Sequence, residues 1–296
     1  MANAEQISEP GVAQRLLFSR STVAKKLAFH GPIVVLIVAL LYPMLWLVGA
    51  SFAPGSSAVG SLPILPERAT LDNYRDGWAG VGNIGFSTYF VNSMAISLIS
   101  IVGNLFSCTM AAYAFARMEF PMKRTLFALL LLTILLPNQV TVIPQYIIFN
   151  ALGMVNTYGP LLIPKFTAVD AFYTFLLVQF IRGIPQSLDE AARIDGCGHA
   201  RIFFWIILPL CLPALATTAV FTFIYSWNDF LGPLLYLNSP DLYTVPLGLS
   251  QFMDATGRSM IGSLFAMSVL SLVPLVVIFA VAQRLLTTGI ATTGAK

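Results

Sequence analysis

Charged side chains are scarce in this sequence: of 296 residues, only 10% are Asp, Glu, Lys or Arg, whereas 57% are hydrophobic. Soluble domains carry roughly 25% charged residues. This deficit excludes a soluble globular protein, and the mean hydropathy of +0.80 indicates an integral membrane protein. The net charge of +3 gives no sign of a nucleic-acid partner.

Cysteine, histidine and nucleotide-binding motifs are also scarce or missing. Cys108 and Cys211 fall in apolar runs and Cys197 in a loop expected to be cytoplasmic, so no structural disulfide is expected. No cluster has metal-ligand spacing, and the phosphate loop G-x-x-x-x-G-K-[ST] does not occur. We therefore expect this chain to hold neither a metal nor a cofactor of its own.

Long apolar runs are abundant. A transmembrane helix needs about 20 apolar residues to cross roughly 30 Å of hydrocarbon. Five stretches free of Asp, Glu, Lys and Arg, with a sixth stretch that carries Lys165 and Asp170, predict an all-α integral membrane protein with six transmembrane helices. The expected spans are residues 32–52, 87–115, 125–148, 158–181, 206–232 and 260–283.

Basic residues set the orientation, because Lys and Arg are enriched in cytoplasmic loops. With the N-terminus inside, the inner segments hold twelve of the sixteen Lys and Arg residues, and the outer loops hold three. Both termini are therefore predicted to be cytoplasmic. We expect a cytoplasmic N-terminal segment at 1–29, a membrane domain at 30–284 and a cytoplasmic tail at 285–296. The first apolar run is too long for a signal-peptide core and is expected to be retained.

A polar stretch on the cytoplasmic side, SLDEAARIDG at residues 187–196, interrupts the apolar runs. Ser187 and Glu190 form the S-x-x-E pattern of a capping box, which predicts a short helix that starts at Ser187. Acidic residues in the first turn and Gly196, placed where a left-handed cap would lie, fit a helix of about two turns.

Two interpretations of this helix follow from the residues alone. It is either a capped connector, or an exposed helix whose Ala191 and Ala192 let another protein pack closely. The spacing favours the second: Glu-Ala-Ala at 190–192, then Gly196, Ile206 and Leu-Pro at 208–209, resembles the EAA signature of ABC importer permeases. Other stretches are similar to the carbohydrate-uptake group, such as the maltose-type permeases: NSMAISLISIVGN, AAYAFARMEFP, IPQYIIFNALGMVNTYGPLLIP, YSWNDFLGPL and TVPLGL.

The resemblance implies a type I ABC importer permease fold in a bacterial plasma (inner) membrane. In this family the EAA helix is the coupling helix, which docks on a cytoplasmic ATPase. The implied coupling residues are Glu190 as polar contact and helix cap, Ala191 and Ala192 as the close-packing face, Asp195, and Gly196 as the turn.

The resemblance also implies partners: a second homologous permease subunit, an ATPase dimer that holds ATP and Mg, an extracytoplasmic solute-binding protein, a sugar substrate and membrane lipid. The chain itself would be a transport subunit and not an enzyme.

Ionisable residues inside spans are costly and are candidates for function. In the expected fourth span, Asp170 lies close to the bilayer midplane, where it would accept hydrogen bonds from sugar hydroxyls. Alternatively, it forms an internal ion pair with Lys165 or contacts the second permease, although a spacing of five is poor for pairing along one helix. Further candidates for the substrate path are Lys165, Asn92, Asn138, Asn228 and Asp229. Hydrogen bonds between helices would explain Asn92, Asn104 and Asn138 as well as contact with a sugar would. Trp227 is expected to anchor its span at the membrane interface.

Two other functions compete with the importer. An ion-coupled secondary transporter would use Lys165, Asp170 and Asp229 as its relay, but it leaves the coupling-helix signature unexplained and lacks a matching second half. A structural or receptor-like subunit would transport nothing. For an importer, the substrate could be a disaccharide, an oligosaccharide or a related polyol, including a polyol phosphate. A neutral sugar is favoured over a phosphorylated substrate, because no span has the basic cluster that would bind a phosphate.

Overall fold

The computed structural model describes residues 12–54, 66, 68–254 and 260–291; within them, the side chains of 12–27, 138, 254 and 284–291 are not described. The regular structure of the described residues is helical, apart from one isolated bridge between Val81 and Ile84. The predicted all-α class is confirmed.

The α-helices in chain order are α1 (Val12–Ser51), α2 (Asp72–Ala79), α3 (Phe86–Arg117), α4 (Lys123–Ile134), α5 (Asn138–Ala151), α6 (Gly159–Leu162), α7 (Ala171–Gly183), α8 (Ser187–Ile194), α9 (His199–Ile202), α10 (Leu208–Leu210), α11 (Leu212–Trp227), α12 (Leu231–Tyr236), α13 (Val245–Asp254) and α14 (Met260–Ala291). The described residues also form two 3-10 helices, η2 (Ile163–Phe166) and η4 (Pro240–Leu242), and one π-helix, η3 (Phe203–Ile207).

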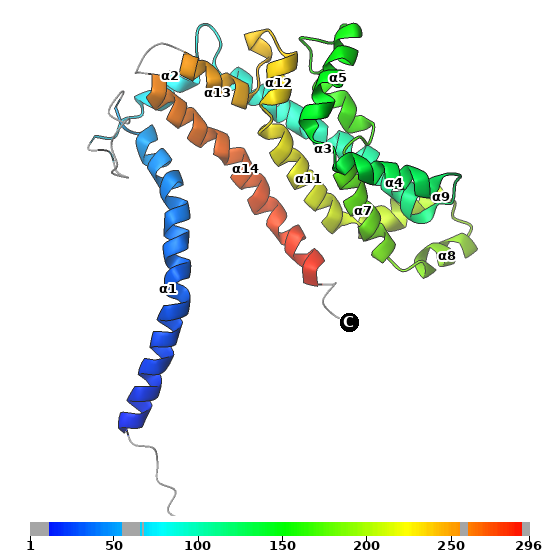
Figure 1. The fold of residues 1–296 in the computed structure, drawn as a ribbon, viewed down its shortest axis with the longest axis horizontal. Helices are drawn as coiled ribbons and strands as arrows, with labels where there is room; N and C mark the ends of the chain where they lie inside the picture. Colours follow the sequence, from blue (N-terminus) through cyan, green and yellow to red (C-terminus); the bar gives the residue numbers. More distant parts are fainter. Residues whose placement is uncertain (1–11, 55–65, 67, 255–259, 292–296) are drawn as a thin grey trace, which may run out of the picture.

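Four of these stretches are long and apolar enough to cross a membrane by themselves: Ala28–Ser51 of α1, α3, Gly159–Gly183, and Met260–Gln283 of α14. Two bent pairs, α4 with α5 and His199–Leu210 with α11, raise the number to six if each pair is one span. Figure 1 shows the start of α1 and the end of α14 on the same side as α8, with α2, α12 and α13 at the opposite side. This arrangement fits six crossings with both described ends on the α8 side.

Several spans differ in detail from the expectation. The expected span 125–148 is two helices whose axes differ by 106°, because Pro137 lies between α4 and α5 and has no backbone N–H to continue the helix. The expected fifth span begins earlier, at His199, and bends by 75° before α11. At the ends, α1 begins at Val12 and α14 reaches Ala291, so both helices continue into the segments predicted as N-terminal segment and tail.

The central helix is α3, which packs against α7 and α11 along its length and against α13 at its outer end. Small polar side chains, spaced three, four or seven residues apart and so on one side of the helix, line its buried face. We call this set the serine stripe: Ser93, Ser97, Ser100 and Ser107. Small residues at helix contacts let backbones approach closely in membrane proteins.

Large apolar side chains gather at both ends of α3. The outer cluster contains Trp227, which is 2% exposed, stacks on Phe223 and donates from Nε1 to the carbonyl of Ser271 at 3.1 Å. The prediction that Trp227 anchors the span at the membrane interface is therefore wrong, because the ring lies inside the protein. The second cluster joins the α8 end of α3 to α7, α8 and η3.

Gly248 of α13 packs directly on the ring of Tyr89 in α3. A Cβ added to Gly248 would lie 2.6 Å from Cγ of Tyr89, which is 1% exposed and has no room to move. Gly248→Ala is therefore expected to lower the free energy of unfolding by about 1–3 kcal/mol, the usual cost of overpacking. Thermal unfolding of the detergent-purified protein measures this loss.

Gly31→Ala is the matched control, because a Cβ added to Gly31 in α1 meets no atom within 4 Å. It should leave the unfolding temperature unchanged or raise it slightly, since alanine favours a helix more than glycine does. Equal unfolding temperatures for the two variants would contradict the packing argument.

Candidate functional site

The helix α8 lies at one end of the molecule, at the lower right of Figure 1. It covers Ser187–Ile194, as the polar stretch predicts. The predicted capping box is wrong, however. Gln186 precedes the helix with a helical φ of −67°, and no side chain caps the first turn. Ser187 thus lies inside the helix, and Glu190 is not needed as a cap.

The end of α8 matches the expectation. Gly196 has a φ of +80°, a left-handed conformation that strains any other residue. Its amide donates to the carbonyl of Arg193 at 3.0 Å, and the amide of Cys197 donates to the carbonyl of Ala192 at 2.9 Å. This pair of bonds is a Schellman motif, which satisfies the last carbonyls and fixes the direction in which the chain leaves.

The two faces of α8 have different surroundings. Asp189 and Ala192 are 6% and 7% exposed, and Ala192 belongs to the apolar cluster beneath the helix. Ala192 was expected to share the exposed packing face with Ala191, but it is buried and packs against the apolar cluster of its own chain. The exposed residues of this region include Glu190, Ala191, Ile194, Asp195 and Gly196.

A buried ion pair joins α8 to the end of α3. Nε of Arg117, the last residue of α3, lies 2.7 Å from Oδ2 of Asp189, and the two side chains are 4% and 8% exposed. Arg117 also donates from Nη2 to the carbonyl of Ile184 at 2.6 Å. Sequence reasoning missed this pair, because Arg117 counted as a loop charge and Asp189 as a first-turn acid. Two features of the sequence could have indicated the pair: Arg117 lies at the end of an apolar span, and Asp189 directly precedes the EAA residues.

The expected fourth span is broken in its middle. The chain passes from α6 into η2, and α7 begins only at Ala171, with Ala168 in between at a φ of +54°. Because of this break, Nζ of Lys165 lies 2.9 Å from Oδ2 of Asp170, with side-chain exposures of 15% and 29%. The two residues therefore pair well in spite of their spacing of five, which would be poor along one continuous helix.

Residues from three elements meet at this break, and we call them the polar cluster: Asn104, Lys165, Asp170, Thr222 and Tyr225. Nδ2 of Asn104 donates to Oδ2 of Asp170 at 2.8 Å and to Oγ1 of Thr222 at 3.1 Å. Nζ of Lys165 lies 5.3 Å from the centre of the Tyr225 ring, in a cation–π contact. Asn104 is fully buried, and its Oδ1 has no hydrogen-bond partner among the described residues. Sequence reasoning did not place Thr222 or Tyr225 on the substrate path.

Asn92, predicted for the substrate path, has a structural role. Its Nδ2 donates to the carbonyls of Asp241 and Tyr243 at 2.8 and 3.0 Å. Both amide hydrogens are thereby used, and the side chain ties the outer part of α3 to the segment before α13.

The other predicted path residues also have local partners where they are described. Oδ1 of Asp229 accepts a hydrogen bond from the amide of Gly232 at 3.1 Å, in the first turn of α12. Asn228 is exposed and donates from Nδ2 to the carbonyl of Ile224 at 2.8 Å. The side chain of Asn138 lies outside the described residues.

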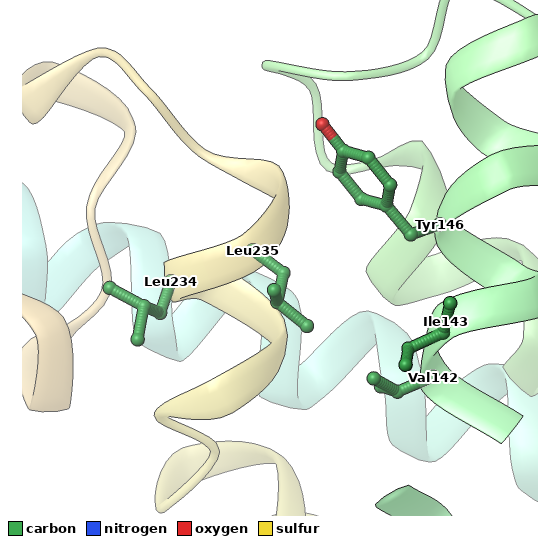
Figure 2. Close-up of a pocket in the computed structure, with 5 residues that line it drawn as sticks. All are labelled: Val142, Ile143, Tyr146, Leu234 and Leu235. Carbon is green, nitrogen blue, oxygen red and sulfur yellow. The ribbon is translucent and has the colours of Figure 1, made fainter. Parts of the chain in front are cut away.

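An apolar hollow of about 250 Å³ lies between α5 and α12. Figure 2 shows the side chains of Val142, Ile143 and Tyr146 on one side and that of Leu235 on the other; Leu234 also lines the hollow. The Tyr146 hydroxyl is the one polar side-chain group among these five residues. The polar cluster is therefore the better candidate for contacts with a hydroxylated solute.

The polar cluster and α8 both fall within a region that matches a known family. The model described as "binding-protein-dependent transport system inner membrane component" matches residues 103–292. The chain belongs to this family. It is an inner-membrane, multi-pass transport subunit, not an enzyme.

Relatives match along most of the chain. A galactooligosaccharides transport system permease protein of Bacillus subtilis is 34% identical, covering 88% of this chain and 91% of its own. A trehalose/maltose transport system permease protein of Thermococcus litoralis is 31% identical, covering 92% of this chain and 97% of its own. These matches support an ABC importer permease over an ion-coupled secondary transporter.

One solved structure shows the fold. A chain from a bacterial ABC transporter involved in the import of the acidic polysaccharide alginate aligns with a TM-score of 0.76 at 21% identity, covering 94% of this chain and 99% of that chain. The type I ABC importer permease fold, predicted from the EAA resemblance, is confirmed.

Proposed function

We propose that this permease subunit imports a neutral sugar and that α8 is its coupling helix, docked on a cytoplasmic ATPase dimer that holds ATP and Mg. A second homologous permease subunit completes the membrane path, and an extracytoplasmic solute-binding protein delivers the sugar. The observation that carries the proposal is the construction of α8: a short helix, fixed from inside, with its EAA residues partly exposed at one end of the molecule.

The exposed face of α8 suits docking. Glu190 supplies a charge, Ala191 allows a close approach, and Ile194, which is 88% exposed, supplies apolar area. The opposite face is held by Asp189 and Ala192, so the helix need not reorder when a partner binds. A prepositioned surface loses less conformational entropy on binding than a mobile one does.

The polar cluster supports a neutral solute. The charge of Lys165 is balanced by Asp170 at 2.9 Å, so the cluster offers hydrogen-bonding groups without a net charge. The relatives named for galactooligosaccharides and for trehalose and maltose point to the same class. We place Asp170 on the path as the acceptor for sugar hydroxyls, with Lys165 and Asn104 holding the carboxylate in position.

The docking proposal is tested by Ala191→Trp. The added ring should overpack the interface and reduce the ATPase that co-purifies with this chain, tagged in its native host, by about fivefold or more, as expected for a loss of 1–3 kcal/mol. Glu190→Lys should act in the same direction by reversing the charge. ATPase retention is measured on the purified complex.

Ala200→Trp is the matched control, since Ala200 is exposed in the neighbouring α9 and lies outside the docking face. It should leave ATPase retention unchanged. If the ATPase stays bound to Ala191→Trp as it does to the wild type, α8 is only a connector. Uptake of labelled maltodextrins into proteoliposomes that requires ATP, and not an ion gradient, would support the importer; uptake driven by an ion gradient alone would contradict it.

A further inference from the structure

The helix α3 runs from the coupling region to the polar cluster. Arg117 at its end pairs with Asp189 of α8, and Asn104, thirteen residues earlier on the same helix, pairs with Asp170. At 1.5 Å per residue, these two contacts are about 20 Å apart along one rigid element. A displacement of the end of α3 therefore changes the position of Asn104 against Asp170.

We propose that the Arg117–Asp189 ion pair is the positioning link through which movement of α8 reaches α3 and the polar cluster. The proposal rests on the docking of α8 on an ATPase, as proposed above. Arg117 and Asp189 contact neither substrate nor nucleotide in this scheme. They act by making α8 and the cytoplasmic end of α3 move as one body.

The guanidinium of Arg117 spans the junction between α7 and α8. It binds the carbonyl of Ile184 at 2.6 Å on one side and Asp189 at 2.7 Å on the other, with Pro185 between them. Apart from this bridge, α8 is held by its short connections and by the contact of Ala192 with the apolar cluster. Rotation of α8 relative to α3 must therefore separate two charges that are at least 92% buried.

The structure of the Arg117–Asp189 pair suggests that it orients α8 relative to α3 more than it stabilises the protein. Oδ1 of Asp189 is buried without a hydrogen-bond partner among the described residues. A buried ion pair contributes to stability only when its remaining polar atoms are well satisfied, and apolar replacements are often neutral. Nε of Arg117 likewise makes no aligned hydrogen bond among the described residues, although it lies 2.7 Å from Oδ2 of Asp189. An incompletely satisfied pair of this kind is better explained by the connection that it makes between α3 and α8 than by stability.

The test removes both charges together. Arg117→Met/Asp189→Leu leaves no unpaired buried charge and should still retain the ATPase in the complex purified from native membranes. In nanodiscs, stimulation of ATP hydrolysis by the sugar-loaded binding protein should fall at least fivefold, the lower range of coupling between distant sites. Asp189→Glu, which keeps the charge, should recover part of the stimulation.

Glu119→Gln is the matched control. Glu119 forms a neighbouring ion pair with Lys123 at 2.9 Å, but its side chain is 90% exposed, so its loss should not change the stimulation. If the double variant does not assemble, Asp189→Asn, which keeps the size of the side chain, decides between the outcomes by the same assay.

Wild-type stimulation in the double variant, or in Asp189→Asn if the double variant fails to assemble, would overturn the link while leaving docking intact. Retention of the ATPase by Ala191→Trp would instead overturn the docking proposal, and the link with it. Retention of the ATPase combined with lost stimulation is the expected signature, since a merely structural pair would affect assembly.

Discussion

Replacement of Lys165 by methionine is expected to lower the free energy of unfolding by about 3 kcal/mol. The reason is that Asp170 would lose its charged partner in a partly buried site and keep Asn104 as its side-chain donor. Breaking one partner of a buried pair is far more costly than removing both. Thermal unfolding of the purified protein in detergent measures the loss.

The double variant Lys165→Met/Asp170→Leu separates the role of the polar cluster in stability from its proposed role in transport. The double variant carries no unpaired charge and should recover most of the unfolding temperature, because the contact between Asn104 and Thr222 remains. Uptake should stay low, since the acceptor proposed for sugar hydroxyls is gone. Normal uptake by a stable double variant would show that the polar cluster is a structural pair outside the substrate path.

Trp227→Ala is expected to destabilise the protein by about 4 kcal/mol, within the range of large aromatic deletions. The ring of Trp227 is 2% exposed, stacks on Phe223 at a centroid distance of 5.5 Å and meets Phe90 edge-on at 5.3 Å. Its loss also leaves the carbonyl of Ser271 without the indole donor. The cavity and the lost hydrogen-bond donor both lower the free energy of unfolding, and chemical or thermal unfolding in detergent measures their combined effect.

Trp205→Ala provides the comparison, because Trp205 in η3 is 79% exposed. It should change the unfolding temperature by no more than a typical surface substitution. Similar losses for the two tryptophans would contradict the placement of Trp227 in the core.

The helical fold and the approximate spans could be predicted because hydrocarbon enforces helices. Backbone groups in a bilayer must bond to one another, so a long run without charge becomes a helix. The breaks could not be predicted equally well. Pro137 gives a local reason for the bend between α4 and α5, but the left-handed Ala168 in the fourth span has no sequence signal. Its conformation depends on how η2 docks on α3, where a Cβ on Gly103 would meet the Phe166 ring at 2.9 Å.

The candidate site was predictable in position but not in detail. The EAA spacing located α8, and Gly196 marked its end, because these are local backbone requirements. Which face of α8 turns inward depends on Arg117, seventy-two positions before Asp189, and no periodicity within eight residues could reveal that partner. The pairing of Lys165 with Asp170 was judged poor for a related reason: the spacing rule assumes a continuous helix, and the backbone there is not continuous.

The serine stripe of α3 affects how this helix can move. Large side chains form ridges that pack into the grooves of a neighbouring helix, and each ridge must leave its groove before the two helices can slide past one another. Serine side chains are too small to form such ridges. A hydrogen bond between two hydroxyl groups, such as that from Ser226 to Ser100 at 3.3 Å, can be replaced by another hydrogen bond a short distance along the helix axis. The Ser100–Ser226 contact between α3 and α11 therefore opposes sliding along the helix axis less than interlocked large side chains would, as in the shear motions of packed helices.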